Sequence, residues 1–339
     1  MSLADRLSED KLCNGDIKPE CSSPALIVGH YCHDKITLPG GRRVDALGGS
    51  VSYITNVFEA LGVFAVVVSK VGQDFIYGSM LKYPPLVVEN QSTTEFFADF
   101  TAGDERLLKV GHVCEAIYPK DILSNRKYDI GLAVGIAGEI LPETLEVMIA
   151  TARIVVVDIQ ALIRTFDPVT RVVSLRRLEE TPFYGLLHRI SYIKAARNEA
   201  AYIDLEAVRK LTCVIVTDGA NGSKVYCKET EWRIPPFVAM DVDQTGAGDS
   251  FLAGFSAGLY QGLSVYQAAR MGNYFGALAV EQVGVPHFKP HQLEKLQEIR
   301  RSEMENIVGS KLSSVAPKLS VPLQNGRHVE AILTKKQSE

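Results

Sequence analysis

Residues 243–251 read Asp-Gln-Thr-Gly-Ala-Gly-Asp-Ser-Phe, and a run with helical spacing follows them over residues 252–261. Gly246 and Gly248 carry no side chain where the chain must turn tightly, so backbone N–H groups can approach a ligand. The start of the following helix adds unpaired N–H groups and the positive end of the helix dipole. The segment therefore predicts an anion site that suits a phosphate group.

Asp249 stands at the start of this helix, beside the predicted anion site. A carboxylate in that position can accept a proton from a hydroxyl group held against it. A string of this kind also arises by chance, and Asp249 would then be only a helix cap. The segment alone leaves both interpretations open, so the remainder of the chain has to decide between them.

Short β-branched runs alternate with longer segments of helical spacing through the middle of the chain. This alternation predicts a parallel sheet covered by helices on both faces. The predicted strands are residues 25–29, 65–69, 129–134, 154–158, 190–193 and 213–217. The predicted helices are residues 52–61, 142–152, 198–210, 249–261 and 265–280.

Two stretches depart from this alternation of strands and helices, at residues 33–45 and 93–113. Both are strand-like, polar at alternate positions and rich in turn residues, so they predict a small antiparallel sheet that projects from the main body. Residues 1–23 are expected to form a polar, disordered lead-in, and residues 302–339 a polar tail. The domain between them is expected to span residues 24–301.

The composition indicates a folded protein with a substantial core: 339 residues, 46% hydrophobic and 22% charged. The net charge of −4 argues against a nucleic-acid partner, whose binding depends on a basic face. No apolar stretch approaches the length of a membrane span, and the first residues do not resemble a secretory signal. The six cysteines form no CxxC pair, and Cys213 and Cys227 are interpreted as free, apolar strand residues of a reducing compartment. A cytoplasmic protein is expected.

Other chemistries fit the sequence less well. It has no G-x-x-x-x-G-K-[ST] loop, and Phe251 occupies the third glycine position of a G-x-G-x-x-G fingerprint. A GxSxG string at residues 254–258 falls inside the predicted helix, whereas a nucleophile elbow requires a strand running into the serine. His30, Cys32 and His33 lie on an extended segment and cannot all face one metal ion.

The order of several motifs resembles the pfkB family of carbohydrate kinases, over roughly residues 24–301. Residues 243–249 are similar to the C-terminal signature of that family, and Gly48-Gly49 with Leu61-Gly62 resembles its N-terminal signature. Residues 71–74 with Gly78 match its VGxD…G turn, and residues 217–222 resemble its TxGxxG loop. This resemblance implies a ribokinase-like three-layer α/β/α sandwich, with a mostly parallel central sheet and a small β-sheet lid.

The resemblance also implies roles for individual residues in the ATP-dependent phosphorylation of a hydroxyl group. Asp249 would be the base, and the N–H groups of Gly246, Ala247 and Gly248 would form the hole for the transferred phosphoryl group. The implied acceptor-binding residues are Asp34, Gly48, Gly49 and Tyr53. The implied nucleotide-flanking residues are Thr217, Gly219, Gly222 and Asn273. Glu199 and Asp243 would support Mg²⁺, with Asp243 an alternative candidate for a monovalent cation site.

Each of these residues also has an ordinary structural interpretation. Asp34 could cap a turn, Gly48 and Gly49 could simply start a helix, and Asn273 could only pack. Glu199 is an acid in the first turn of a predicted helix, where the dipole favours it.

The sequence departs from the family pattern at three positions; Tyr53 argues against ribose-like acceptors, and Ala196 weakens the expected metal site. Tyr53 stands where the family often has Asn, Ala196 replaces the Asn of its N-x-x-E element, and Gln160 replaces the Asn of Asp-x-Asn. Together with the sequences of residues 29–34 and 48–62, these departures resemble the inositol kinase branch of the family. That resemblance implies a small polyol, myo-inositol, as acceptor. The alternatives are another acceptor, such as fructose, ribose or a nucleoside, or a catalytically silent scaffold. Either a monomer or a homodimer formed through the lid is compatible with the sequence.

Overall fold

An eight-stranded sheet forms the centre of the molecule, which we describe from a computed structural model for residues 23–297, except residues 39, 100 and 102–106. The strand order is β16-β15-β14-β13-β10-β9-β1-β4. Six strands are parallel, and β15 and β16 add an antiparallel edge that the sequence did not predict. The strands are β1 (Ala25–Val28), β4 (Ala65–Val68), β9 (Tyr128–Ala133), β10 (Ala152–Asp158), β13 (Tyr192–Ala196), β14 (Cys213–Thr217), β15 (Ser223–Cys227) and β16 (Thr230–Ile234).

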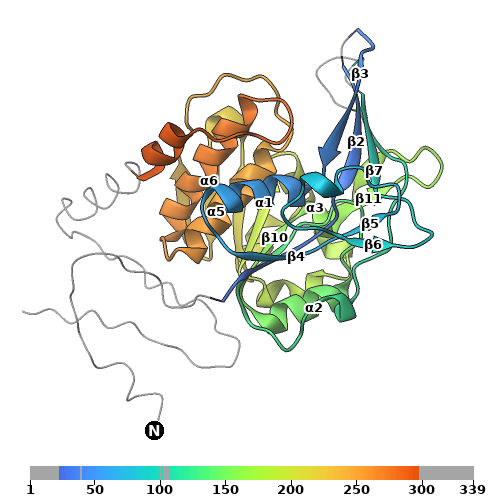
Figure 1. Ribbon diagram of the computed structural model, residues 1–339. Coiled ribbons are helices and arrows are strands. Elements are labelled where there is room, and N and C mark those ends of the chain that lie inside the picture. Colours follow the sequence, from blue (N-terminus) through green and yellow to red (C-terminus); the bar gives the residue numbers. More distant parts are fainter. Residues whose placement is uncertain (1–22, 39, 100, 102–106, 298–339) are drawn as a thin grey trace, which may run out of the picture.

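Helices cover both faces of this sheet, as the alternating pattern predicts. Figure 1 shows α1, α5 and α6 on one face and α2 on the other. Because apolar side chains of the sheet point to both faces, two hydrophobic cores form, one on each side. The helices are α1 (Ser50–Ala60), α2 (Pro142–Thr151), α3 (Gln160–Ile163), α4 (Leu205–Val208), α5 (Ala247–Tyr260) and α6 (Val265–Val280).

The predicted helix over residues 198–210 is wrong. The structure has a short 3-10 helix, η6 (Glu199–Tyr202), and then the single turn α4. Ile203 is extended between them, and the Asp204 side chain accepts a hydrogen bond from the Ala207 N–H group. A new N-cap therefore interrupts a segment that has helical spacing throughout. Further 3-10 turns are η2 (Gly78–Met80), η3 (Pro119–Asp121), η4 (Leu178–Glu180), η5 (Tyr184–Arg189) and η7 (Gly219–Asn221).

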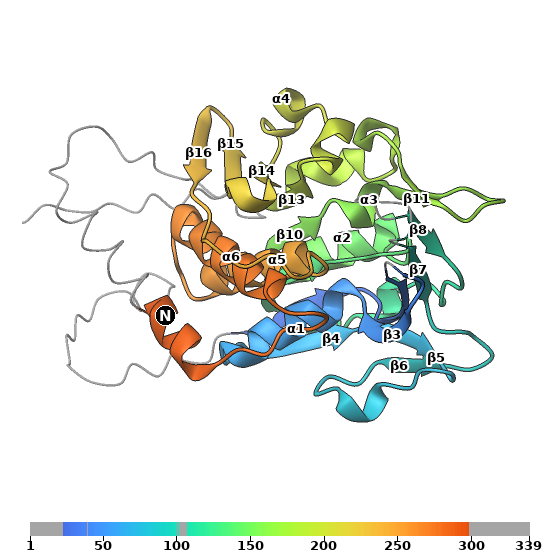
Figure 2. The same cartoon turned by 90° about the horizontal axis from the view of Figure 1, so that it is seen from above.

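A second sheet projects from the main body, as expected (Figures 1 and 2). We call it the lid sheet; its strands, in order, are β3 (Arg43–Gly48), β2 (Cys32–Thr37), β7 (Glu95–Asp99) and β8 (Leu107–Val110). The expectation of a purely antiparallel sheet is wrong, because β2 and β7 run parallel. Parallel neighbours need a long crossover, and here that crossover passes through α1 and β4 in the main body.

Two small sheets flank the lid sheet. One pairs β5 (Lys70–Gly72) with β6 (Leu86–Val88), and the other is the hairpin of β11 (Arg164–Phe166) and β12 (Val173–Leu175). The hairpin touches the lid sheet, because Val110 donates its N–H to the carbonyl of Arg171 at 3.0 Å and Lys109 forms a bridge with Val172.

Residues 1–22 of the expected lead-in (residues 1–23) and the whole expected tail (residues 302–339) lie outside the described residues, as do residues 298–301 of the expected domain. Among the helices of the described part of the chain, none is long and apolar enough to cross a membrane.

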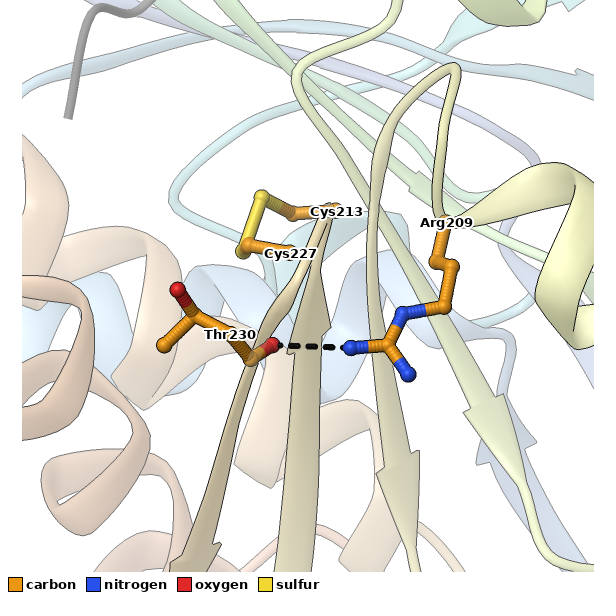
Figure 3. Close-up of a disulfide and its surroundings, with 4 residues drawn as sticks. All are labelled: Arg209, Cys213, Cys227 and Thr230. Carbon is orange, nitrogen blue, oxygen red and sulfur yellow. Dashed lines mark hydrogen bonds between the residues drawn. A yellow bond between two sulfur atoms is a disulfide. The ribbon is translucent and has the colours of Figure 1, made fainter.

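The interpretation of Cys213 and Cys227 as free thiols is wrong. The two residues face each other across the antiparallel strands β14 and β15 and form a disulfide, with Cα atoms 4.4 Å apart (Figure 3). Arg209 holds the same end of the hairpin, because its guanidinium donates to the Thr230 carbonyl at 3.2 Å. No CxxC spacing announces this disulfide, because the two cysteines lie 14 positions apart and meet only through the register of the two strands. Of the described cysteines, Cys32 and Cys114 are free.

Reducing the Cys213–Cys227 bond should lower the free energy of unfolding, because an unfolded chain closed over a loop of this size loses entropy. The expected loss is about 3 kcal/mol or less. Urea titrations with and without a dithiol reductant measure it. The double variant C213A/C227A is the control and should not respond to the reductant; an identical urea midpoint for the unmodified protein in both conditions would contradict the prediction.

Candidate active site

A cleft that is open to solvent lies between the lid sheet and the main body. The lid sheet contributes Cys32, Asp34, Ile36, Phe96, Ala98 and Leu108. The main body contributes Gly49, Ser50, Tyr53, Ile136, Gln160, Arg164, Thr245, Gly246 and Asp249. The cleft therefore brings together Asp249, Gly246, Asp34, Gly49 and Tyr53 from the sequence prediction.

The glycine-rich loop ends where α5 begins. Gly246 is the N-cap of α5, with a left-handed φ of 76°. A Cβ atom at this position would lie 2.0 Å from Cε1 of Tyr53, so only glycine lets the loop pass beneath the ring. Gly248 and Asp249 belong to the first turn, where N–H groups have no partner within the helix. The Ala247 N–H donates to the Gln244 carbonyl at a long 3.3 Å, a contact that a phosphoryl group would have to replace.

Asp249 is partly exposed at the floor of the cleft. Desolvation raises the pKa of its carboxyl group above the ordinary value, and the nearby Asp158 carboxylate raises it further. Lys194, a hydrogen bond from the Ser50 hydroxyl and the charge of Arg164 act in the opposite direction. Asp249 therefore has the raised proton affinity that suits a general base, together with contacts that favour its charged form.

Lys194 and Asp158 form a buried ion pair beneath α5. They are register partners on β13 and β10, and Nζ lies 3.0 Å from Oδ2. Burial alone would lower the pKa of Lys194, but the carboxylates of Asp158, Glu199 and Asp249 raise it well above its usual value. A Cβ atom at Gly248 would lie 2.9 Å from this ammonium group, so the glycine admits the lysine against the first turn of α5.

Gly48 and Gly49 make room for other parts of the site. A Cβ atom at Gly48 would lie 2.2 Å from Cγ of Asp34, and one at Gly49 would lie 2.3 Å from the His30 carbonyl oxygen. Gly49 also has φ 90° and is the N-cap of α1. Of the two, only Gly49 lines the cleft. In the structure the pair therefore allows Asp34 and the start of α1 to approach each other.

The aromatic ring of Tyr53 forms one wall of the cleft and is almost fully buried. Burial raises the pKa of its phenol, and the carboxylates of Asp34, Asp249 and Asp243 and the Cys32 thiol raise it further. Its hydroxyl group therefore stays protonated near carboxylates on both sides of the site.

None of the four residues predicted to flank the nucleotide lines the cleft, and two of them, Gly222 and Asn273, lie against residues 234–236. A Cβ atom at Gly222 would lie 2.3 Å from the Ile234 carbonyl oxygen. Asn273 donates its side-chain amide to the carbonyls of Ile234 and Pro235, at 3.1 and 2.9 Å. Both residues therefore fix the same segment, beyond the end of β16. Thr217, at the end of β14, donates to the Ala195 carbonyl at 3.4 Å, and Gly219 begins η7 with φ 50°.

The two predicted metal-supporting carboxylates each bond to backbone. Glu199 accepts the Ala196 N–H at 2.7 Å, and Asp243 accepts the Thr245 N–H at 2.9 Å. Across the described ranges, no three His, Cys, Asp or Glu side chains gather where they could hold a metal ion. The described side chains therefore do not form a complete metal site by themselves. In kinases, Mg²⁺ is usually bound by one or two carboxylates together with substrate phosphates and water.

The sequence prediction missed four polar residues of this region, which are Ser50, Gln160, Arg164 and Lys194. Gln160 Nε2 donates to Ser50 Oγ at 2.9 Å, and Arg164 donates to both the Gln160 side chain and the Ile136 carbonyl. The replacement of Asn by Gln160 was visible as a departure from the family, but its contact with Ser50 spans 110 positions. Only the folded chain brings the two side chains together.

The fold matches solved kinases of the ribokinase family. A pyrophosphate-dependent kinase of that family, complexed with a pyrophosphate analog and myo-inositol, aligns with TM-score 0.68 and 18% identity, over 80% of this chain and 99% of that one. Ribokinase from Thermotoga maritima aligns with TM-score 0.63 and 18% identity, over 81% and 99% of the two chains. The fold is therefore that of the ribokinase-like small-molecule kinases.

Sequence comparison gives the family. Residues 192–292 match the pfkB family carbohydrate kinase. The chain is 46% identical to an inositol 3-kinase of Arabidopsis thaliana, over 84% of this chain and 82% of the relative. It is 47% identical to an inositol 3-kinase of Oryza sativa subsp. japonica, over 81% and 72%. The chain belongs to the pfkB family of carbohydrate kinases, and it is a phosphotransferase that uses an alcohol group as acceptor. The family implies a kinase reaction that uses ATP, typically with Mg²⁺.

Replacing Gly246 by Ala should destabilise the protein more than replacing Gly262 by Ala. Both glycines have φ near 80°, which an alanine adopts at a cost of about 1 kcal/mol, but no atom lies within 4 Å of a Cβ at Gly262. At Gly246 the added methyl group must also displace the Tyr53 ring. Urea unfolding of both variants isolates this steric contribution; equal losses of stability would show that Tyr53 does not constrain the loop.

Proposed function

We propose that this kinase transfers the γ-phosphoryl group of ATP to myo-inositol, giving inositol 3-phosphate. One observation supports this most directly: the cleft holds Asp249 at the start of α5, together with a second carboxylate, Asp34, on the lid sheet. The extended identity with inositol 3-kinases from two plants supports the choice of acceptor and of the hydroxyl that is phosphorylated.

In the proposed reaction, Asp249 accepts the proton of one acceptor hydroxyl while that oxygen forms a bond to the γ-phosphorus. The bond from this phosphorus to the β–γ bridging oxygen breaks, and ADP leaves with the electron pair. The N–H groups of Gly246, Ala247 and Gly248, at the positive end of α5, stabilise the charge on the moving group. Phosphoryl transfer depends mainly on such positioning and charge neutralisation, so little further protein chemistry is required.

The lining of the cleft suits a polyol ring, which has a rim of hydroxyl groups and two faces of C–H bonds. Asp34, Gln160 and Arg164 offer acceptors and donors for the rim. Apolar side chains and the ring of Tyr53 would contact the C–H faces. The apolar residues are Ile36, Phe96, Leu108 and Ile136.

For the nucleotide and metal we propose roles without a detailed geometry. Thr217, Gly219, Gly222 and Asn273 would shape the nucleotide side, with Asn273 acting through residues 234–236. Glu199 and Asp243 would contact hydrated Mg²⁺, and Asp243 is also the candidate for a monovalent cation. Bound to the phosphates, Mg²⁺ would supply the charge neutralisation that the protein carboxylates cannot. The cytoplasmic location, and a monomer or a dimer through the lid sheet, remain predictions.

A panel of acceptors tests the proposed substrate. Formation of the phosphorylated acceptor is measured with myo-inositol, other cyclic polyols, fructose, ribose and nucleosides, with ATP or pyrophosphate as donor. Turnover that requires ATP and myo-inositol, with the product position assigned by NMR, is the expected result. Preference for a sugar or nucleoside would favour the second candidate, a pfkB kinase for another acceptor, and lack of turnover with every acceptor would favour a silent scaffold.

The variant D249N tests the base. It should lower kcat by about 10²- to 10⁴-fold, because the amide cannot accept the acceptor proton. Binding of ATP, measured by calorimetry, should be nearly unchanged and serves as the control for folding. Near-normal turnover by D249N would rule out Asp249 as the base.

A further inference from the structure

A buried glutamate, Glu139, holds the loop that follows β9. Its exposed fraction is 1%, and both of its carboxylate oxygens accept hydrogen bonds from backbone N–H groups. Oε2 lies 2.7 Å from the Ala137 nitrogen, both oxygens lie 3.0 Å from the Ile136 nitrogen, and Oε1 lies 2.9 Å from the His30 nitrogen. Within the described part of the chain Glu139 forms no ion pair. These N–H groups therefore compensate much of the cost of removing the carboxylate from water.

The peptide group between Ile136 and Ala137 lies between two opposite charges. Its N–H group donates to Glu139 at 2.7 Å, and its carbonyl accepts a hydrogen bond from Arg164 Nη1 at 3.0 Å. Because the peptide bond is trans, its N–H and C=O groups point in opposite directions, so the carboxylate and the guanidinium lie on opposite sides of it. Each charge faces the end of the peptide dipole that attracts it. The two side chains therefore interact through this peptide group.

The guanidinium at one end of this arrangement belongs to the acceptor cleft. Arg164 lines the cleft, and the described residues accept two hydrogen bonds from it, at the Ile136 carbonyl and the Gln160 side chain. A guanidinium group carries five N–H donors, so donors remain for the hydroxyl groups of an acceptor. The ring of Phe96, on the lid sheet, has its centroid 5.9 Å from Cζ of Arg164. The orientation of the Ile136 carbonyl therefore helps to decide where the remaining donors point.

Glycines flank the peptide that Glu139 holds. Residues 135–138 read Gly-Ile-Ala-Gly, and Gly138 has a left-handed φ of 79°. Such neighbours lower the steric cost of rotating the peptide group between them. A flip would turn the carbonyl away from Arg164 and the Ala137 N–H away from the carboxylate. The hydrogen bonds of Glu139 therefore oppose the flip.

We propose that Glu139 is a positioning residue: it fixes the peptide group between Ile136 and Ala137, and that peptide group orients the Arg164 guanidinium toward the acceptor hydroxyl groups. The proposal rests on the proposed function, because it requires that the acceptor binds in this cleft. Glu139 itself does not line the cleft, so it acts on the acceptor through Arg164.

The nearly isosteric variant E139Q tests the proposal. Both oxygens of Glu139 accept backbone N–H groups, whereas a glutamine has one acceptor oxygen and must turn its NH₂ group toward an N–H donor in either orientation. The peptide group should then shift. The dissociation constant and the KM for myo-inositol should each rise by about tenfold or more, the range for losing a hydrogen bond to a charged group. The value of kcat and the dissociation constant of ATP, measured by calorimetry, should stay close to those of wild type.

E179Q is the matched control. Glu179 also accepts a backbone N–H group from a distant position, that of Asp204 at 2.9 Å, but neither residue lines the cleft. E179Q should leave the affinity for myo-inositol unchanged, and urea unfolding of both variants reports any loss of the fold. If E179Q weakens myo-inositol binding as much as E139Q does, the proposal is overturned.

A second pair of variants shows whether Glu139 acts through Arg164. R164M removes the guanidinium group, so adding E139Q to R164M should weaken myo-inositol binding little further. Equal weakening by E139Q in both backgrounds would overturn the proposal, because Glu139 would then act by another route, such as its bond to His30. A folded E139Q variant that binds myo-inositol like wild type would overturn it as well.

The interaction can also be measured without an acceptor and with Glu139 in place. The protein is labelled with ¹⁵N at alanine, the Ala137 signal is assigned from its loss in A137S, and its amide proton shift is compared between wild type and R164M. Loss of the guanidinium group should move this proton upfield, because the peptide group is no longer polarised from its carbonyl side. An unchanged shift would contradict the proposal even if E139Q does not fold.

These results separate the positioning role from the proposed function. If the Ala137 signal moves in R164M but wild type phosphorylates no acceptor, the link between Glu139 and Arg164 stands and the proposed function fails. If wild type phosphorylates myo-inositol and E139Q does so with an unchanged KM, the proposed function stands and the positioning role fails.

Discussion

The ion pair between Lys194 and Asp158 sets the charge balance on which the rest of the site depends. A carboxylate at the base of a cleft is partly removed from water, and a second carboxylate nearby would favour protonation of one of the two. The ammonium of Lys194 offsets both negative charges, because it lies 3.0 Å from Asp158 and against the first turn of α5. Breaking such a pair by removing one partner is usually costly, since the remaining charge is buried without compensation. The parallel register of β10 and β13 holds the two residues side by side.

Close contacts at glycines assemble the walls of the cleft around this pair. At Gly246, Gly48 and Gly49 a Cβ atom would overlap an aromatic ring, a carboxylate and a carbonyl oxygen, respectively. These contacts join α5 to α1, β3 to its hairpin neighbour β2, and the start of α1 to the segment that follows β1. The glycines that the sequence suggested as points of approach for a ligand thus also bring the protein's own groups together.

The sequence predicted those parts of the structure that depend on local pattern. The predicted strand over residues 213–217 and the predicted helix over residues 265–280 agree with the structure at both ends. The helix begins directly after Ser264, which forms a capping box with Gln267. Prediction failed at Asp204, where a local capping signal interrupts the helical pattern. It also failed for the disulfide between Cys213 and Cys227, which depends on how two strands pair. It also missed the hydrogen bond between Gln160 and Ser50, because these two residues lie 110 positions apart in sequence.

The bond between Val110 and Arg171 joins the lid sheet to the β11–β12 hairpin, and the first residue of that hairpin is Arg164. The guanidinium group of Arg164 in turn reaches Gln160, beside the start of α1. The outer wall of the cleft and its polar interior are therefore held together by one connected series of hydrogen bonds, although they belong to separate sheets.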